Sequence, residues 1–360
     1  MRQDGKISAG QLLMLAFLTR IIIMISVDSQ LAGGKNLLDL SLSAVCYLGL
    51  SLVLILPAWM LHKRYPELDL LDAASYGLGK AGQITALLYA AYFLFMNSYF
   101  LTLFEQFMEE EVNPRLPVWL VSAAVLAVAC YGAFLGLESI ARTAGFLFLL
   151  ACAGILFLLV SLNSELRSEN FTPLLYDGAG QTVQGTLLFL SRSTFYSVLP
   201  ILLPKTTGSV RLKYLLWNVG LTLFFIVLIV TVCGTLGPMA GIKAFPVYTM
   251  SSLAQSGPFQ RLDAVYIGIW MMGLFLTLAL DLYLVCVCIS HVFGKTAGRI
   301  SILAGALALV VSTNTIFQTE AVQLSVFRLE FILIATLLTG LVIPCVILAA
   351  VRRKGKQHGQ

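Results

Sequence analysis

The sequence predicts an all-α polytopic membrane protein with ten transmembrane helices and both termini in the cytoplasm. Composition, the length of the apolar runs and the distribution of basic residues lead to this class. Of the 360 residues, 59% are apolar and 11% are charged, and the mean hydropathy is +0.90. A soluble domain carries roughly 25% charged residues. The chain therefore has too few charges to cover a water-facing surface.

Ten apolar runs occupy most of the chain, and each is close to the ~20 residues with which a helix crosses ~30 Å of hydrocarbon. The polar start, Met1–Gln11, is short and has no small-residue cleavage signature, so we interpret the first run as a retained span and not as a signal peptide. We expect residues 1–360 to form a single transmembrane domain. The runs span residues 11–31, 41–61, 84–104, 117–136, 143–162, 185–204, 214–236, 264–290, 299–317 and 329–351.

Basic residues outside the runs decide the orientation. With the N-terminus inside, fifteen Lys and Arg residues fall in inner segments and six in outer segments. Cytoplasmic loops of membrane proteins carry an excess of Lys and Arg, so this bias places both termini in the cytoplasm. The net charge of +5 reflects this topology and gives no indication of nucleic-acid binding.

Two arginines, Arg20 and Arg192, lie deep inside apolar runs, in the similar settings "FLTR" and "FLSR". Matching features in the first and sixth of ten spans predict two five-helix repeats, approximately residues 8–162 and 183–351. An odd number of helices per repeat inverts the second repeat in the membrane, as in many secondary transporters.

The sixth run carries the signs of an interrupted helix, which such transporters use at the midplane. The polar residues Ser191, Arg192, Ser193 and Thr194 follow a short apolar half, and Pro200 then removes a backbone donor. The first run has no Gly or Pro between Gln11 and Leu31, so the sequence gives no corresponding break there.

A charged side chain at the centre of a membrane helix costs about 2.5–3.5 kcal/mol on insertion scales. Neither arginine has an acidic residue within one helical turn, and Asp281 in the eighth run is the single acid deep in any run. Two arginines and one aspartate leave one positive charge. A bound anion, most simply a ligand carboxylate, would neutralise it.

Structural roles for the arginines remain open at this point. Either side chain could extend to the membrane interface or pair with an acid at a helix end. An arginine–Asp281 pair could also be a clamp between helices. The acids available at helix ends are Glu138, Asp28 and Asp263.

The sequence shows little sign of a metal site, a cofactor site or a catalytic site. The seven cysteines all lie inside runs, and the "CVC" at 286–288 places its thiols on different helix faces, so we expect neither a metal site nor a cofactor. The three histidines lie at the predicted inner side or in the tail, and no outward Ser/His/Asp set is present. We therefore do not expect an enzyme.

Four stretches resemble one known family. They are "GKISAGQL" at the start, "GLESIAR" after the fourth run, "NFTPLL" after the fifth and, most specifically, "FPVYTMSSLAQSGPFQRLDAVYIGIWMMGLFL" at 245–276. Together, in order and over the whole chain, they resemble the spore germination permeases, the B subunits of GerA-type germinant receptors within the amino acid–polyamine–organocation superfamily.

The resemblance implies a ten-helix LeuT-type protein of the spore inner membrane that binds a small germinant such as an amino acid. It implies partnership with a membrane-embedded A subunit and a lipoprotein C subunit, in contact with the lipid bilayer and without nucleic acid. It also implies a ligand site near the midplane between spans one, three, six and eight. The candidate ligand-binding residues are Thr19, Arg20, Asn97, Tyr99, Ser191, Arg192, Ser193 and Asp281.

The chain departs from the family pattern at this site. The first span lacks the small residues and proline of relatives, and Arg192 stands where an acidic residue is common in the sixth span. Our hypothesis is that guanidinium groups bind the ligand carboxylate here in place of backbone amides. The alternatives are an ion-coupled amino acid permease and a structural subunit with a degenerate ligand site.

Overall fold

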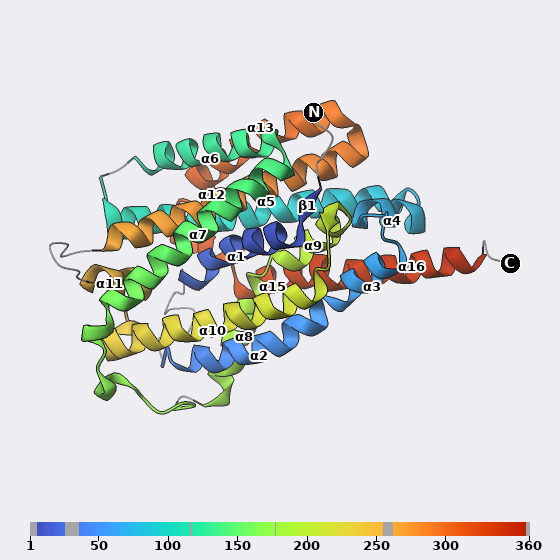
Figure 1. The fold of residues 1–360 in the computed structure, drawn as a ribbon. Coiled ribbons are helices and arrows are strands. Elements are labelled where there is room, and N and C mark those ends of the chain that lie inside the picture. The colour runs from blue at the N-terminus through green and yellow to red at the C-terminus, as the bar shows by residue number, and fades with distance from the viewer. Residues whose placement is uncertain (1–5, 26–35, 116, 177, 255–261, 358–360) are drawn as a thin grey trace.

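A computed structural model describes residues 6–25, 36–115, 117–176, 178–254 and 262–357 of the chain. Its long helices lie side by side in one bundle (Figure 1). The helices are α1 (Ala9–Ile25), α2 (Asp39–Leu54), α3 (Leu56–Arg64), α4 (Leu70–Leu78), α5 (Ala81–Phe107), α6 (Val118–Leu135), α7 (Leu137–Ser161), α8 (Ala179–Ser191), α9 (Phe195–Leu202), α10 (Arg211–Leu236), α11 (Pro246–Leu253), α12 (Asp263–Phe293), α13 (Lys295–Thr315), α14 (Glu320–Val326), α15 (Leu329–Leu337) and α16 (Ile343–Gln357). The remaining elements are the strands β1 (Ile7–Ser8) and β2 (Thr206–Thr207), the π-helices η1 (Met108–Val112) and η6 (Leu338–Val342), and the 3₁₀ turns η2 (Asn163–Glu165), η3 (Ser168–Asn170), η4 (Leu203–Lys205) and η5 (Gly237–Gly241).

The predicted spans correspond to helices in the expected order. Nine stretches of the described chain are long and apolar enough to cross a membrane, and each overlaps one of the second to tenth predicted runs. The first run is represented by α1, of which Ala9–Ile21 forms a shorter apolar helix. The polytopic helical class is therefore confirmed. The count of ten and the repeats at 8–162 and 183–351 stay predictions.

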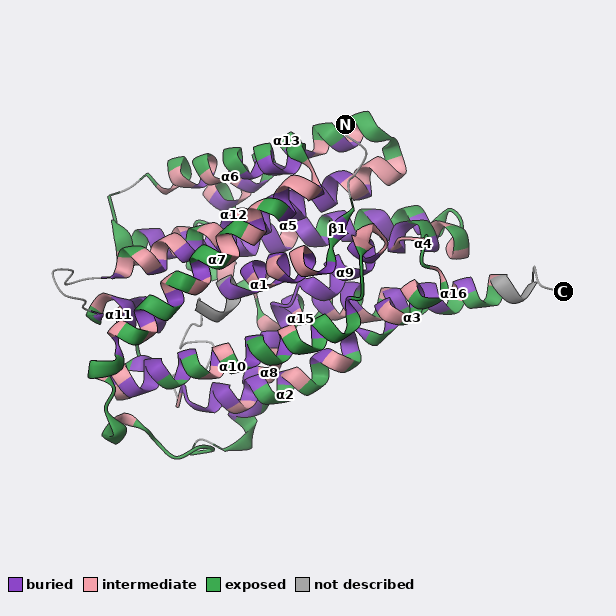
Figure 2. Cartoon of the chain, viewed as in Figure 1, coloured by how far each residue is buried: buried purple, intermediate pink, exposed green. Residues whose placement is uncertain are grey.

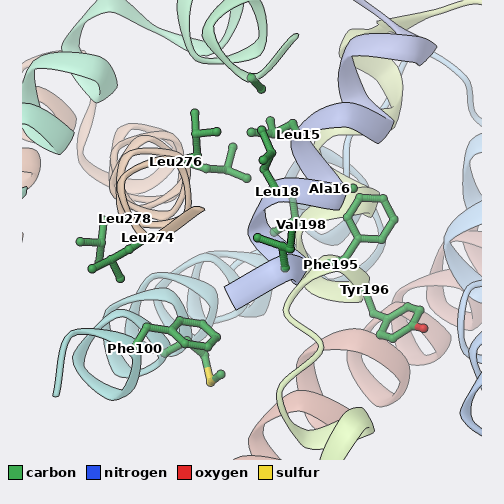
Figure 3. Close-up of a cluster of buried hydrophobic side chains, with 14 of the residues drawn as sticks. Leu15, Ala16, Leu18, Phe100, Phe195, Tyr196, Val198, Leu274, Leu276 and Leu278 are labelled. Atoms are coloured by element: carbon green, nitrogen blue, oxygen red, sulfur yellow. The ribbon is translucent and has the colours of Figure 1, made fainter. Parts of the chain in front are cut away.

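The core of the bundle is α12, which packs against α1, α5, α6, α7 and α13. Buried residues gather on α1, α5 and α12, whereas α6, α7 and α13 carry many exposed residues on their outer faces (Figure 2). Figure 3 shows where the inner helices meet, with Leu15 of α1, Val198 of α9, Leu276 of α12 and Phe100 of α5 around one apolar cluster. The outer faces carry large apolar side chains such as Leu149, 66% exposed, as a lipid-facing surface requires.

The sixth span is broken as its sequence predicts. Helix α8 ends at Ser191 and α9 begins at Phe195. Two glycines let other helices approach this span closely. A Cβ on Gly185 would lie 2.4 Å from Ser43 Oγ of α2, and one on Gly340 of η6 would lie 2.8 Å from Tyr196 Cβ. The broken span is thus held by α2 on one side and by the last span on the other.

Two very short strands form a parallel pair that helical periodicity does not predict. Ile7 pairs with Thr206 and Ser8 with Thr207, and Thr207 Oγ1 donates to the Ile7 carbonyl at 3.3 Å. A two-residue pair has no recognisable sequence pattern, because alternation needs several residues. It ties the segment before α1 to the segment after α9, on the predicted cytoplasmic side.

The loop at 237–262 is long enough in sequence for a lid or a short surface helix. Its described part contains η5 and α11, and residues 255–261 lie outside the described chain. Phe107 of α5 joins Tyr248 of α11 to Trp270 of α12, with ring centroids 5.2 and 4.1 Å away. Helix α11 is thereby packed onto α12 by aromatic contacts.

Candidate functional site

The break between α8 and α9 exposes backbone groups in the middle of the bundle, where water is scarce. The Ser191 carbonyl accepts a hydrogen bond from Thr336 Oγ1 of α15 at 2.6 Å, and Thr336 lies 3.1 Å from the Tyr92 hydroxyl of α5. Non-helical backbone at membrane depth is tolerated where protein or a polar cavity satisfies it. Side chains of the last and third spans therefore stabilise the break.

A cavity of about 730 Å³ reaches this break from the predicted outer side, and we call it the outer cavity. Its size lies within the range of small-molecule sites. It is bounded by the outer half of α5, the end of α8, the segment before α11 and the α14–α15 region. Its walls are Tyr99, Thr102, Leu103, Gln106, Glu109, Glu110, Gln184, Leu188, Ser191, Arg192, Ala244, Phe245, Gln318, Glu320, Gln323, Leu324, Phe327, Arg328, Leu329, Glu330 and Ile332.

Arg192 lies at the buried end of the outer cavity and is only 4% exposed. Its guanidinium carbon stands 5.4 Å from the centroid of the Tyr99 ring, a cation–π distance. Within the described chain, no hydrogen bond or ion pair reaches this guanidinium. A buried cation with five donors and no acceptor is costly, so the geometry favours an anion at this end.

Charge changes along the outer cavity. The exposed end carries four glutamates and one arginine, whereas Arg192 is the charged residue at the buried end. Uncharged amides and hydroxyls, among them Gln184 and Thr102, lie between the charged residues of the wall. The cavity therefore offers a cationic base and an acidic mouth. The charged residues of the mouth are Glu109, Glu110, Glu320, Glu330 and Arg328.

Arg20 occupies a different environment, on the other side of the break. Its guanidinium donates to Ser193 Oγ and stands 4.4 Å from the centroid of the Tyr47 ring of α2. Ser193 Oγ in turn lies 3.1 Å from the Tyr47 hydroxyl, which is 2.6 Å from the Tyr196 hydroxyl. Arg20 is 3% exposed and does not line the outer cavity. A π-face and a hydroxyl stabilise its charge, and its Nε has no hydrogen-bond partner within the described chain. These contacts are the arrangement of a clamp between α1, α2 and the break.

Thr19 and Asp281 come together in a third place. They line a small cavity between α1, α9 and α12, about 10 Å³ in volume, together with Thr194 and Thr277. Asp281 is 1% exposed, and its Oδ2 has no hydrogen-bond partner within the described chain. It forms no ion pair with either arginine there. The arginine–Asp281 pair considered from the sequence is therefore not seen among the described residues.

Asn97 is fully buried in α5, but it does not line the outer cavity. Neither its Nδ2 nor its Oδ1 has a hydrogen-bond partner among the described residues. Of the predicted ligand-binding residues, the structure thus gathers Tyr99, Ser191 and Arg192 around the outer cavity. The other five lie elsewhere.

The two described helix-end acids that the sequence offered as partners for Arg20 and Arg192 contact other residues. Glu138 pairs with Arg142 one turn along α7, and Asp263 lies 3.3 Å from the Tyr248 hydroxyl. Asp28 lies outside the described residues. No group of three or more His, Cys, Asp or Glu side chains that could hold a metal ion occurs in the described ranges.

Sequence reasoning missed the aromatic partner of Arg20, Tyr47, and the glutamines that line the outer cavity, Gln106, Gln184 and Gln323. Nothing in the local sequence marks these residues. The acidic mouth of the outer cavity could have been predicted in part, because "EQFMEEEVNP" places several acids at the outer end of the third span. Linking it to Arg192 required the tertiary structure.

The sequence of this chain is similar to those of known proteins. Residues 44–322 match the model of a family described as spore germination protein. The chain is similar to YfkT of Bacillus subtilis (strain 168), with 26% identity over 254 residues that cover 68% of this chain and 70% of YfkT. It is also similar to the spore germination protein YndE of the same organism, with 24% identity over 269 residues, 72% of this chain and 73% of YndE.

The fold is similar to that of a Na⁺-coupled sialic acid symporter in its substrate-bound, outward-open state. The TM-score is 0.61 at 10% sequence identity, over 97% of this chain and 90% of the symporter. At this identity the similarity concerns the fold alone. It confirms that the chain has a LeuT-type transporter fold.

Proposed function

Because this chain belongs to the spore germination protein family, we propose that it binds a small germinant carrying a carboxylate, most simply an amino acid, in the outer cavity. Binding there triggers germination. In this proposal the chain is the transporter-like subunit of a germinant receptor in the spore inner membrane, assembled with an A subunit and a lipoprotein C subunit.

The observation that carries the proposal is the state of Arg192. Its guanidinium is buried, faces a cavity of about 730 Å³ and has no acceptor within the described chain. A carboxylate matches the planar fork of a guanidinium in a bidentate geometry. Tyr99 supports the guanidinium from its ring face, and Ser191 ends the helix beside it.

The charges of the mouth narrow the ligand class. Four glutamates and one arginine give the mouth a net negative charge. A dianion would be repelled there, whereas a zwitterion presents its ammonium to the mouth and its carboxylate to Arg192. The uncharged amides of the wall suit a polar, uncharged side chain. We therefore favour a neutral amino acid over a dicarboxylate.

The proposal is tested by thermal unfolding of the purified protein against a panel of amino acids, dicarboxylates, sugars and nucleosides. A ligand at about 100 times its dissociation constant stabilises a protein by about 2.7 kcal/mol. We expect a neutral amino acid to raise the unfolding midpoint of the wild type and to leave Arg192→Gln unchanged. Arg192→Lys, which keeps the charge but loses the fork, should retain part of the shift.

Arg142→Gln is the matched control, because Arg142 is an exposed arginine remote from the outer cavity, and it should respond like the wild type. A wild type that responds to no compound would contradict the proposal and favour a degenerate ligand site. If the ligand raises the unfolding midpoint of Arg192→Gln as much as that of the wild type, the ligand binds at a different site.

An ion-coupled amino acid permease is the second candidate, favoured by the fold shared with a Na⁺-coupled symporter. Uptake of the labelled ligand into liposomes under an imposed ion gradient distinguishes the two. Binding without net uptake supports a receptor subunit, and gradient-dependent uptake supports a permease.

A further inference from the structure

A second large cavity lies at the predicted cytoplasmic ends of α3 and α10 and shares no lining residue with the outer cavity. It has a volume of about 420 Å³, and we call it the inner cavity. It lies between α3, the η4–β2 segment and the start of α10. Its walls are Leu56, Trp59, Met60, His62, Lys63, Leu203, Thr206, Gly208, Ser209, Val210 and Arg211.

The charged residues of the inner cavity are all basic. Lys63 and Arg211 are exposed, and no Asp or Glu lines the walls. The Arg211 guanidinium carbon stands 5.9 Å from the centroid of the Trp59 ring, which orients it toward α3. No ion pair to either basic side chain occurs in the described chain. The first turn of α10 contains no acid, and no side chain caps it.

Two buried nitrogen atoms of the same walls also lack partners. Trp59 Nε1 and His62 Nδ1 are shielded from solvent, and no acceptor or donor is found for them in the described ranges. Buried polar atoms are usually hydrogen-bonded, and each exception needs an explanation. Because these two atoms are shielded from solvent, the polar groups that a ligand in the inner cavity can contact directly are the exposed side chains of Lys63 and Arg211.

The inner cavity also has an apolar part with exposed side chains. Leu56 and Met60 are 40% and 47% exposed, and they lie one to two turns before Lys63 on α3. Leu212 at the start of α10 is 63% exposed. Because α3 is the predicted inner end of a stretch long and apolar enough to span the membrane, we expect its last turn at the level of the lipid headgroups and the preceding turns at the level of the acyl chains.

We propose that the inner cavity binds one anionic phospholipid of the inner leaflet. The phosphate lies between Lys63 and Arg211, and the acyl chains run along Leu56 and Met60. A free phosphate would use the basic residues but leave the exposed apolar side chains unused, and a zwitterionic lipid would place a positive choline beside two cations. Basic pockets between helices on the cytoplasmic side suit anionic headgroups.

Native mass spectrometry of the protein in neutral detergent tests this proposal with phosphatidylglycerol, phosphatidylcholine and inorganic phosphate as probes. We expect the wild type to retain one phosphatidylglycerol in preference to phosphatidylcholine. The double substitution Lys63→Gln/Arg211→Gln should weaken this retention roughly 30-fold, since each basic residue near a membrane surface contributes about fivefold. Lys295→Gln/Arg299→Gln is the matched control, because both residues are basic, exposed and on the same predicted face but outside the inner cavity.

Equal retention by the two double variants, or equal retention of the two lipids by the wild type, would overturn the proposal. Displacement of the lipid by inorganic phosphate at millimolar concentration would overturn it as well, in favour of a simple anion site. The unfolding midpoint in the same neutral detergent shows whether the variants fold.

A second measurement does not depend on the folding of the charge variants. Brominated phosphatidylglycerol should quench tryptophan fluorescence more than brominated phosphatidylcholine does. This excess should disappear in Trp59→Phe, which keeps an aromatic ring in the wall and removes the reporter. An excess that persists in Trp59→Phe would place the lipid elsewhere and contradict the proposal.

Discussion

The Arg20 guanidinium of α1 donates a hydrogen bond to the Ser193 hydroxyl in the break between α8 and α9. The same guanidinium stands 4.4 Å from the ring centroid of Tyr47. This relationship joins the first, second and sixth spans at one buried point. It explains how a charged residue is tolerated in the apolar run "AFLTRIIIMI": a π-face and a hydroxyl replace part of its hydration.

Arg20→Gln should destabilise the fold. The substitution removes a charge-assisted hydrogen bond and a desolvated cation–π contact, which together contribute on the order of 2–4 kcal/mol. We expect a lower thermal unfolding midpoint without ligand. Arg142→Gln, which breaks an exposed pair with Glu138 within one helix, should change stability by less than about 0.5 kcal/mol. Similar midpoints for the two variants would show that Arg20 is not a clamp.

Charge neutralisation at the mouth of the outer cavity should change affinity in a salt-dependent way. With Glu109→Gln/Glu330→Gln, a neutral amino acid should bind a few-fold more weakly at low salt, and the preference for it over a dicarboxylate should shrink. The difference from the wild type should fade at about 0.5 M salt because exposed charges are screened. Isothermal titration at two salt concentrations measures this. Glu138→Gln, remote from the mouth, is the control, and an effect of equal size there would argue against electrostatic selection.

Gly340→Ala should disturb the contact between η6 and α9. The added Cβ would lie 2.8 Å from Tyr196 Cβ, and overpacking of this kind costs typically about 1–3 kcal/mol. Gly220→Ala is a matched control, because no atom lies within 4 Å of a Cβ at that exposed position of α10. It should stabilise the helix by up to about 1 kcal/mol. We expect the thermal unfolding midpoint to fall in Gly340→Ala and to rise in Gly220→Ala. An unchanged midpoint in Gly340→Ala would contradict the close approach of η6 to α9.

Asp69, before α4 and outside the membrane-spanning stretches, should make stability depend on pH. Its Oδ1 accepts the Asp72 amide at 2.9 Å as the N-cap of α4, while burial raises the pKa of the Asp69 carboxyl above its ordinary value. A raised pKa in the folded state means that the stability this group contributes is present at low pH and is lost as pH rises through that pKa.

Asp69→Asn keeps the cap and removes the titration. At pH 7 it should unfold at a higher temperature than the wild type. The difference should shrink as pH falls below the raised pKa and vanish below the ordinary pKa of an aspartate, where the carboxyl is protonated in the folded and the unfolded state. Asp69→Ala should be less stable at every pH by about 1 kcal/mol, because the cap is lost. A difference between Asp69→Asn and the wild type that grows toward acid pH would have the wrong sign for this explanation.

Much of the membrane architecture could be predicted because its causes are local. A helix must be about 20 apolar residues long to cross the hydrocarbon, so run length marks the spans without any knowledge of packing. The cause of the break in the sixth span is also local. Four polar residues at 191–194 weaken helix continuity where they stand, and α8 does end at Ser191, whereas α9 continues through Pro200.

The roles of the intramembrane charges could not be predicted in this way. "FLTR" and "FLSR" have nearly the same local chemistry, yet Tyr47 of α2 meets Arg20 whereas Tyr99 of α5 and a cavity meet Arg192. Counting charges suggested that Asp281 neutralises an arginine, but α12 places it in a small cavity beside Thr19. The sequence by itself determined that the protein lies in a membrane, where its spans lie along the chain and where the sixth span breaks. These features depend on the composition of each segment alone. Only the tertiary structure decided which arginine faces open space, because that depends on side chains contributed by helices far apart in the chain.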